Sequence, residues 1–171
     1  MKIQGGKFLT FALAEEIYGI PLKTAKEIVG MQEITTIPKT KKYIKGVMNL
    51  RGKIIPIIDL RLKFDMTEKA YSDRTCIIVI EMTFNSDRRL VGIVVDTVAE
   101  VRNIQKNELE EVGCDVQSQD DLLMGLGKLN DKVILLIDIE KIVTKDEAVI
   151  LNLNSPSYST NQGAPKFAES M

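Results

Sequence analysis

The chain contains an internal repeat, and this repeat limits the folds that it can adopt. YGIPLKTAKEI at 18–28 aligns with VGIVVDTVAEV at 91–101, and KGVMNLRGKIIPIIDL at 45–60 aligns with MGLGKLNDKVILLIDI at 124–139. The two matches lie further apart in the second copy, which places an insertion between Asn103 and Met124. We therefore interpret the chain as two copies of one small unit.

Both copies consist of short apolar stretches that are rich in β-branched residues. They are shorter than typical helices and often alternate with polar residues, so they predict strands. The stretches are 7–14, 17–22, 27–31, 46–50 and 53–60 in the first copy, and 76–84, 89–96, 98–104, 123–129 and 132–139 in the second. Because small sheets must curl to protect their edges, we expect a mostly β fold of two small barrels in tandem, each of about five strands.

The repeat also predicts the boundaries of the two units. We expect a first barrel over 7–64, a polar connector at 65–74 and a second barrel over 75–145, with an exchange of end strands between the barrels left open. Few helical turns are expected, at 39–44, at 60–64, in the insertion and at 140–144. The tail at 154–171 is rich in Ser, Pro, Gly and Asn, and its small apolar content predicts disorder.

The composition argues against most kinds of enzyme. The chain has no histidine, and its two cysteines, Cys76 and Cys114, lie in unrelated contexts without a metal-ligand spacing. GLGK at 125–128 lacks the other residues of a phosphate-binding loop. We therefore expect no catalysis, no cofactor and no metal.

The chain also shows no candidate transmembrane segment or signal peptide. No apolar run approaches the ~18 residues that cross a bilayer, and the apolar stretch near the N-terminus is followed at once by Glu15 and Glu16. We expect a cytoplasmic protein without direct membrane contact.

Residues that recur in both copies are interpreted as parts of the scaffold. Asp59 and Asp138 end equivalent strands, so each is predicted to cap the turn or helix that follows. Two further aligned pairs are Gly46 with Gly125 and Glu27 with Glu100. For these residues a structural role is the default interpretation.

Positions at which the copies differ lack that explanation. Three of them form a positive, hydrogen-bonding group on one hairpin of the first copy: Lys45, Asn49 and Arg51, opposite Met124, Lys128 and Asn130. Arginine suits carboxylate recognition and is common in interface hot spots. An exposed arginine beside a turn glycine is also often only solvated, so the residues themselves leave both interpretations open.

IKGVMNLRGKIIPIIDLRLKF at 44–64 closely resembles the CheW family of bacterial chemotaxis coupling proteins, and LVGIVVDTVAEV and GLGKLNDKVILLIDIEKI resemble its other stretches in the same order. The resemblance covers residues 7–145 and implies two intertwined five-stranded SH3-like barrels. It implies an adaptor without catalytic activity. Its partners would be the regulatory domain of the histidine kinase CheA and the cytoplasmic tips of chemoreceptors, and it would be recruited to membrane-associated receptor arrays.

The resemblance also assigns receptor contacts in this sequence. They are Ala25, Glu27, Ile34, Gly46 and Arg51, to which the comparison of the copies adds Lys45 and Asn49. Gly46 and Glu27 therefore carry two interpretations, as scaffold and as contact. Ala25 is smaller than the aliphatic residue expected there. For the kinase, the resemblance indicates only exposed apolar edges of the first barrel and no single residue.

Two other functions remain as alternatives. A related scaffold of a non-chemotaxis kinase pathway would have the same sequence features. Nucleic-acid binding is suggested by the basic run at 39–53, but the run contains a single aromatic residue, Tyr43, and the net charge of the chain is -1. We therefore expect no nucleic-acid partner.

Overall fold

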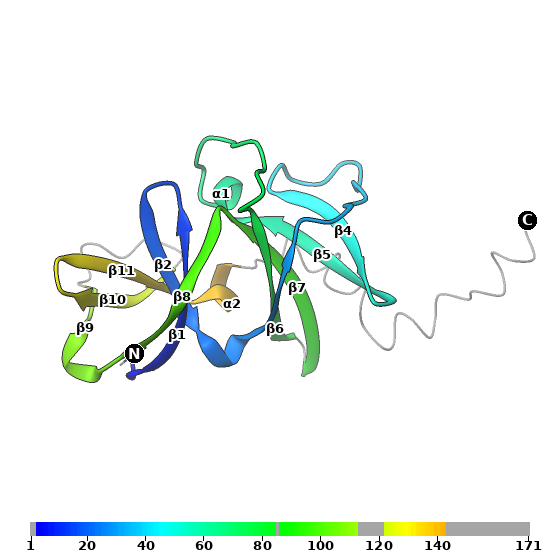
Figure 1. Ribbon diagram of the computed structural model, residues 1–171. Coiled ribbons are helices and arrows are strands. Elements are labelled where there is room, and N and C mark those ends of the chain that lie inside the picture. Colours follow the sequence, from blue (N-terminus) through cyan, green and yellow to red (C-terminus); the bar gives the residue numbers. More distant parts are fainter. Residues whose placement is uncertain (1–2, 85, 113–121, 143–171) are drawn as a thin grey trace, which may run out of the picture.

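The computed structural model describes residues 3–84, 86–112 and 122–142, and these residues form two β-sheets side by side (Figure 1). The larger sheet has the strand order β8-β1-β2-β11-β10-β9. Its strands are β1 (Gly6–Leu13), β2 (Glu16–Pro21), β8 (Thr97–Ile104), β9 (Leu109–Glu110), β10 (Leu123–Leu129) and β11 (Lys132–Ile137).

The smaller sheet has five strands in the order β3-β6-β7-β5-β4. They are β3 (Ala25–Gly30), β4 (Ile44–Leu50), β5 (Lys53–Asp59), β6 (Cys76–Phe84) and β7 (Asp87–Val95). The prediction of a mostly β fold with two small sheets is confirmed. The larger sheet has one strand more than expected because part of the insertion pairs with β10 as the two-residue strand β9.

Each sheet combines strands from both copies of the repeat. The β1–β2 hairpin pairs with β8 and β11, whereas the β6–β7 hairpin pairs with β3 and β5. The two parallel pairings have equivalent registers, with Gly19 opposite Leu136 and Gly92 opposite Ile57. The copies have therefore exchanged hairpins, and neither sheet coincides with the continuous ranges 7–64 and 75–145.

The helices are short and lie at matching places in the two copies. α1 (Leu60–Lys63) follows β5, and α2 (Ile139–Ile142) follows β11 between the two sheets (Figure 1). Two 3-10 turns, η1 (Leu22–Thr24) and η2 (Lys106–Glu108), lie after β2 and in the insertion. Where a helical turn was expected at 39–44, the structure has turns at 38–39 and 42–43 without a helix, and Ile44 begins β4. η1 was not expected, and the tail at 154–171 lies outside the described residues.

The two aspartates cap the helices as the repeat predicts. Asp59 Oδ1 accepts hydrogen bonds from the backbone N–H groups of Arg61 and Leu62, at 3.0 and 3.4 Å. Asp138 Oδ1 accepts one from the N–H of Glu140 at 3.2 Å. These carboxylates satisfy donors that a helix start leaves without partners, which explains their recurrence in both copies.

Three apolar clusters hold the sheets together. One lies within the smaller sheet, one within the larger sheet and one between the sheets, where both helices contribute. β6 shows how a central strand serves two clusters: Ile77 and Val79 point into the smaller sheet, while Ile78 and Ile80 point to the cluster between the sheets. Burial of both faces explains the uninterrupted apolar run CIIVI.

Candidate functional site

The turn between β4 and β5 presents Arg51 to solvent. Leu50 pairs with Lys53, so Arg51 and Gly52 form a two-residue turn, and both have positive φ, 51° and 89°. Asn49 stabilises this turn because its Oδ1 accepts a hydrogen bond from Gly52 N–H at 2.8 Å. Asparagine and glycine suit left-handed backbone, whereas arginine does not. The turn therefore does not itself require an arginine at position 51.

The equivalent turn of the second copy has the residue that the backbone favours. Asn130 aligns with Arg51 and has a φ of 58°. Two hairpins with the same strained position thus carry different side chains, and only the first carries a cation there. This difference supports a role for the Arg51 side chain beyond the turn.

Arg51 forms an ion pair with Glu27 across the smaller sheet. Its Nη2 donates a hydrogen bond to Glu27 Oε1, and the pair leaves 69% of the Arg51 side chain exposed and 32% of that of Glu27. The hydrogen bond, with the charge of Glu27, raises the pKa of Arg51 above its ordinary value.

The Arg51–Glu27 ion pair shows how strongly the smaller sheet is curled. Glu27 lies on β3 and Arg51 follows β4, and these strands form opposite edges of the five-stranded sheet. In a flat sheet they would lie roughly 19 Å apart, because neighbouring strands are spaced by ~4.8 Å. The contact therefore requires a strongly curled sheet, which brings the two edges together.

Gly46 packs closely against the backbone of Thr35 and Thr36. It is buried with a φ of 137°, and a Cβ atom there would lie 2.0 Å from the carbonyl oxygen of Thr35. The next residue, Val47, exchanges two backbone hydrogen bonds with Thr35, at 2.8 and 2.9 Å. The close approach of two backbones at Gly46 supports the scaffold interpretation of this residue.

Ile34 and Ala25 lie close to the same curled sheet. Ile34 is half-buried against the apolar cluster of the smaller sheet, one residue before the bridge from Thr35 to Val47. Ala25 begins β3 and packs against the cluster between the sheets. Both residues are partly exposed, but they pack against different clusters, and only Ala25 shares a strand with Glu27.

Lys45 does not lie with Asn49 and Arg51, although the sequence analysis grouped the three residues. Arg51 lies six positions beyond Lys45 along the chain, about 20 Å at the usual rise of a strand. Its ammonium group lies 3.6 Å from Glu68 Oε1 and 5.6 Å from the centre of the Tyr71 ring. The positive group at the hairpin tip therefore reduces to Arg51, and the basic run at 39–53 does not gather on one spot.

The sequence did not predict a largely enclosed ion pair at the meeting point of the two sheets. Arg61 Nη1 lies 2.8 Å from Asp96 Oδ2, and the side chains are only 14% and 11% exposed. Asp96 Oδ2 also accepts a hydrogen bond from the N–H of Ala14 in the β1–β2 turn, at 2.8 Å. The pair thus links α1 and β7 to the exchanged hairpin. Because Arg61 and Asp96 are far apart in sequence, no local sequence pattern predicts this ion pair.

Exposed apolar side chains also follow the repeat. Ile28 on β3 is 45% exposed and aligns with Val101 on β8, which is 48% exposed. Ile54 on β5 and Val133 on β11 are 40% and 50% exposed and align in the same way. Each sheet therefore presents two outward apolar residues at equivalent strand positions, a signal that the aligned copies contain but that the sequence analysis did not use.

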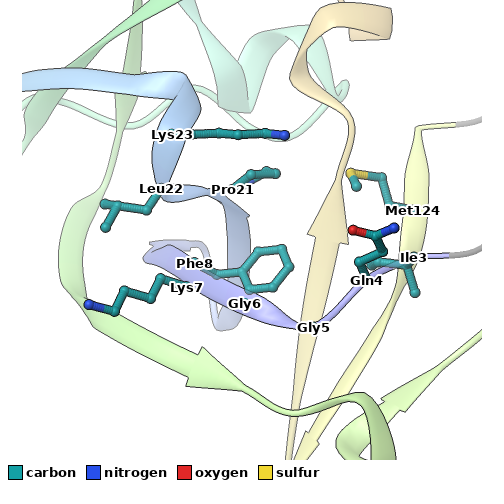
Figure 2. A pocket seen from close by; sticks show the side chains of 10 residues that line it. All are labelled: Ile3, Gln4, Gly5, Gly6, Lys7, Phe8, Pro21, Leu22, Lys23 and Met124. Atoms are coloured by element: carbon teal, nitrogen blue, oxygen red, sulfur yellow. The ribbon is translucent and has the colours of Figure 1, made fainter.

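A separate pocket of about 580 Å³ opens at the larger sheet, near the start of β1 (Figure 2). It contains none of the predicted contact residues. Its lining is Ile3, Gln4, Gly5, Gly6, Lys7, Phe8, Pro21, Leu22, Lys23 and Met124. Among the described residues, no acidic side chain lines it, and none of them form a group of three or more suited to a metal ion.

None of the helices in the described part of the chain is both long enough and apolar enough to span a bilayer.

These observations define a class of protein: a paired β-sheet scaffold that presents an exposed arginine, surface ion pairs and exposed apolar side chains. The chain belongs to the family of proteins with a CheW-like domain, whose model matches residues 7–147. The chemotaxis protein CheW of Klebsiella aerogenes is 39% identical over 155 residues, which are 90% of this chain and 91% of that protein.

Other relatives agree in sequence and in fold. The chemotaxis protein CheW of Helicobacter pylori is 31% identical over 140 residues, 82% of each protein. The crystal structure of the scaffolding protein TtCheW from Thermoanaerobacter tengcongensis has a TM-score of 0.72 at 34% identity, over 81% of this chain and 92% of that chain. The resemblance predicted from the sequence is thereby confirmed.

Proposed function

We propose that this protein is an adaptor without catalytic activity that couples chemoreceptors to the histidine kinase CheA in bacterial chemotaxis. Membership of the CheW-like family supports an adaptor, and the names of the relatives support chemotaxis over another kinase pathway. The observation that carries the proposal is the Arg51–Glu27 pair, since it places a largely exposed arginine on a turn that does not need one.

The receptor-binding surface of this proposal is centred on Arg51. One side of its guanidinium contacts Glu27 and the remaining donors face solvent, where a carboxylate or carbonyl of a helical receptor tip can accept them. Ile34 and Ala25 would add partly exposed apolar surface of the same sheet region. Gly46 and Asn49 would maintain the backbone shape of this hairpin. Lys45 lies further along β4, where it contacts Glu68 and Tyr71, and would add a second positive charge to the surface.

The kinase would contact a different part of the surface. The exposed apolar residues Ile28 and Ile54 lie on outward positions of the smaller sheet, which is the kind of surface that the family resemblance indicates for the regulatory domain of CheA. Exposed apolar side chains flanked by polar residues suit an interface between proteins. In this arrangement the protein is cytoplasmic and reaches the membrane only through its receptor partner.

Reconstitution tests the adaptor function. Chemoreceptor membranes, CheA and this protein are combined, and CheA autophosphorylation is measured with and without attractant. We expect receptor control of the kinase only when the protein is present. Kinase activity that follows attractant equally well without the protein would contradict the proposal.

A charge reversal tests the site. Arg51→Glu should reduce receptor pull-down and kinase control together, while leaving the thermal unfolding curve nearly unchanged because exposed charges contribute little to stability. Arg102→Glu is the matched control: Arg102 on β8 is 42% exposed and pairs with Glu100, the residue aligned with Glu27, at 3.1 Å. Equal losses in both variants would remove the special role of Arg51.

A further inference from the structure

The pocket near the start of β1 combines an apolar lining with positive charge. Phe8 is buried, and Ile3 and Met124 pack against the apolar cluster of the larger sheet to which Phe8 belongs. Lys7 and Lys23 also line the pocket. A volume of about 580 Å³ falls within the roughly 300–1,000 Å³ typical of small-molecule sites. The pocket is therefore large enough for a ligand and not only for a single side chain.

Figure 2 shows how the polar side chains are placed around this space. The Lys23 side chain runs past Pro21 toward Met124, and the amide of Gln4 lies next to Met124. Among the residues that the structure describes, neither Lys7 nor Lys23 has an ion-pair partner. Since no acidic side chain of the described residues lines the pocket either, its positive charge is not balanced within it.

The first copy of the repeat shows what the equivalent place accepts. Three lining residues align with residues around Tyr71: Pro21 with Val94, Lys23 with Asp96 and Met124 with Lys45. The Lys45 ammonium group lies 5.6 Å from the centre of the Tyr71 ring, and Tyr71 Oη donates a hydrogen bond to Asp59 Oδ2 at 2.8 Å. Only about 10 Å³ of cavity remains there. An aromatic ring that carries a polar group therefore fills this place in the first copy.

The charges at this place are reversed in the second copy. Asp96 pairs with Arg61 at 2.8 Å, so its charge is balanced within the fold. Lys23 and Glu140 align with these two residues, yet both are exposed and form no ion pair with each other in the structure. Glu140 does not line the pocket. An occupant of the second place is therefore expected to be negatively charged.

We propose that this pocket binds a small organic carboxylate with an apolar or aromatic body. The body lies against Ile3, Phe8 and Met124, where burial of apolar surface drives binding. The carboxylate accepts hydrogen bonds from the Lys23 ammonium group, which fixes the orientation of the ligand. None of the proposed receptor or kinase contacts lines the pocket, so this binding is independent of the coupling function.

Matched probes test the charge of the ligand. 3-Phenylpropionate, 3-phenylpropanol and 3-phenylpropylamine share one apolar body and differ in charge. Each is titrated into the isotope-labelled full chain to about 10 mM, a range in which ligands of this size bind detectably, and amide NMR shifts are followed. We expect shifts at 3–8, 22–24 and 123–125, with 3-phenylpropionate binding about fivefold more tightly than the alcohol, the scale of one exposed charge contact. The amine should bind most weakly, and acetate should cause no such shifts.

A charge reversal tests the role of Lys23. Lys23→Glu should weaken binding of 3-phenylpropionate by about tenfold, because it replaces an attraction with a repulsion, and should leave 3-phenylpropanol nearly unaffected. Lys132→Glu is the matched control, since Lys132 is an exposed lysine of the same sheet that lies outside the pocket. Equal weakening in both variants would reduce the effect to net charge and overturn the proposal. Circular dichroism establishes that both variants retain their sheets.

Nuclear Overhauser effects locate the probe on the unaltered protein. The phenyl protons of 3-phenylpropionate should show contacts to the methyl groups of Ile3, Leu22 and Met124. Contacts only to the exposed apolar residues of the two sheets would show unspecific adsorption, and these residues are Ile28, Ile54, Val101 and Val133. That result would overturn the proposal, as would equal affinity for the three phenyl probes or an absence of shifts around the pocket.

Discussion

The β4–β5 and β10–β11 hairpins share one backbone design and differ in the side chains mounted on it. Both have a register shift at an aligned glycine, Gly46 or Gly125, and both hold the first turn residue at positive φ. Only the first hairpin places an arginine at that turn and pairs it with the opposite edge of its sheet. The shared backbone features are therefore required by the repeated unit, whereas the arginine at position 51 is specific to the first copy.

The largest loss of stability is expected when the aligned glycines of the two hairpins are replaced. Gly46→Ala should destabilise the protein by about 3 to 5 kcal/mol, because the new Cβ would meet the Thr35 carbonyl at 2.0 Å in a left-handed conformation. Gly125→Ala should cost only about 1 to 2 kcal/mol, since its nearest atom, the Glu110 carbonyl oxygen, lies at 3.0 Å. Urea unfolding of both variants measures the difference, and equal losses would show that the two bulges are equally tight.

The helix caps are expected to differ by a smaller amount. Asp59→Ala should cost about 2 to 3 kcal/mol, because Asp59 is 3% exposed and its carboxylate accepts hydrogen bonds from two backbone N–H groups and from the Tyr71 hydroxyl. Asp138→Ala should cost about 1 kcal/mol, the usual value for a cap. Asp59→Asn retains an acceptor and should recover part of the loss. A loss at Asp138 as large as that at Asp59 would contradict this account.

Exchanging Arg51 and Asn130 tests directly whether the arginine serves the turn or a partner. Asn130→Arg should destabilise the protein by about 1 kcal/mol, since arginine is less suited to left-handed backbone. Arg51→Asn should have the opposite sign in thermal unfolding and yet weaken receptor pull-down by about tenfold, the scale of a single interface hot spot. A variant that loses stability and binding together would make Arg51 a structural residue.

The smallest effect is expected at the partner of Arg51. Glu27→Gln should leave the unfolding midpoint almost unchanged, because the ion pair is exposed to solvent. Any change should decrease at high salt, which screens exposed charges. Glu100→Gln, which disturbs the aligned pair on β8, is the control in both measurements. Receptor binding that falls with Glu27→Gln and not with Glu100→Gln would identify Glu27 as more than scaffold.

Local features of this protein were predictable because they depend on neighbouring residues. Apolar stretches predicted the strands, and the recurrence of Asp59 and Asp138 predicted helix caps that the structure confirms. Lys45 and Arg51 share one hairpin as predicted, but they lie near opposite ends of β4, so closeness in sequence does not bring their charges together. The receptor contacts themselves stay predictions.

The repeated unit, its strands, its caps and its turns follow from the sequence, since each arises from contacts within a short stretch of chain. The pairing of each hairpin with strands of the other copy depends on long-range contacts and became visible only in the folded chain. β5 and β11 have nearly the same sequence pattern, so β2 has two equivalent edges available and no local signal selects between them. The exchange of hairpins, the largely enclosed Arg61–Asp96 pair and the contact of Glu27 with Arg51 all depend on these long-range pairings.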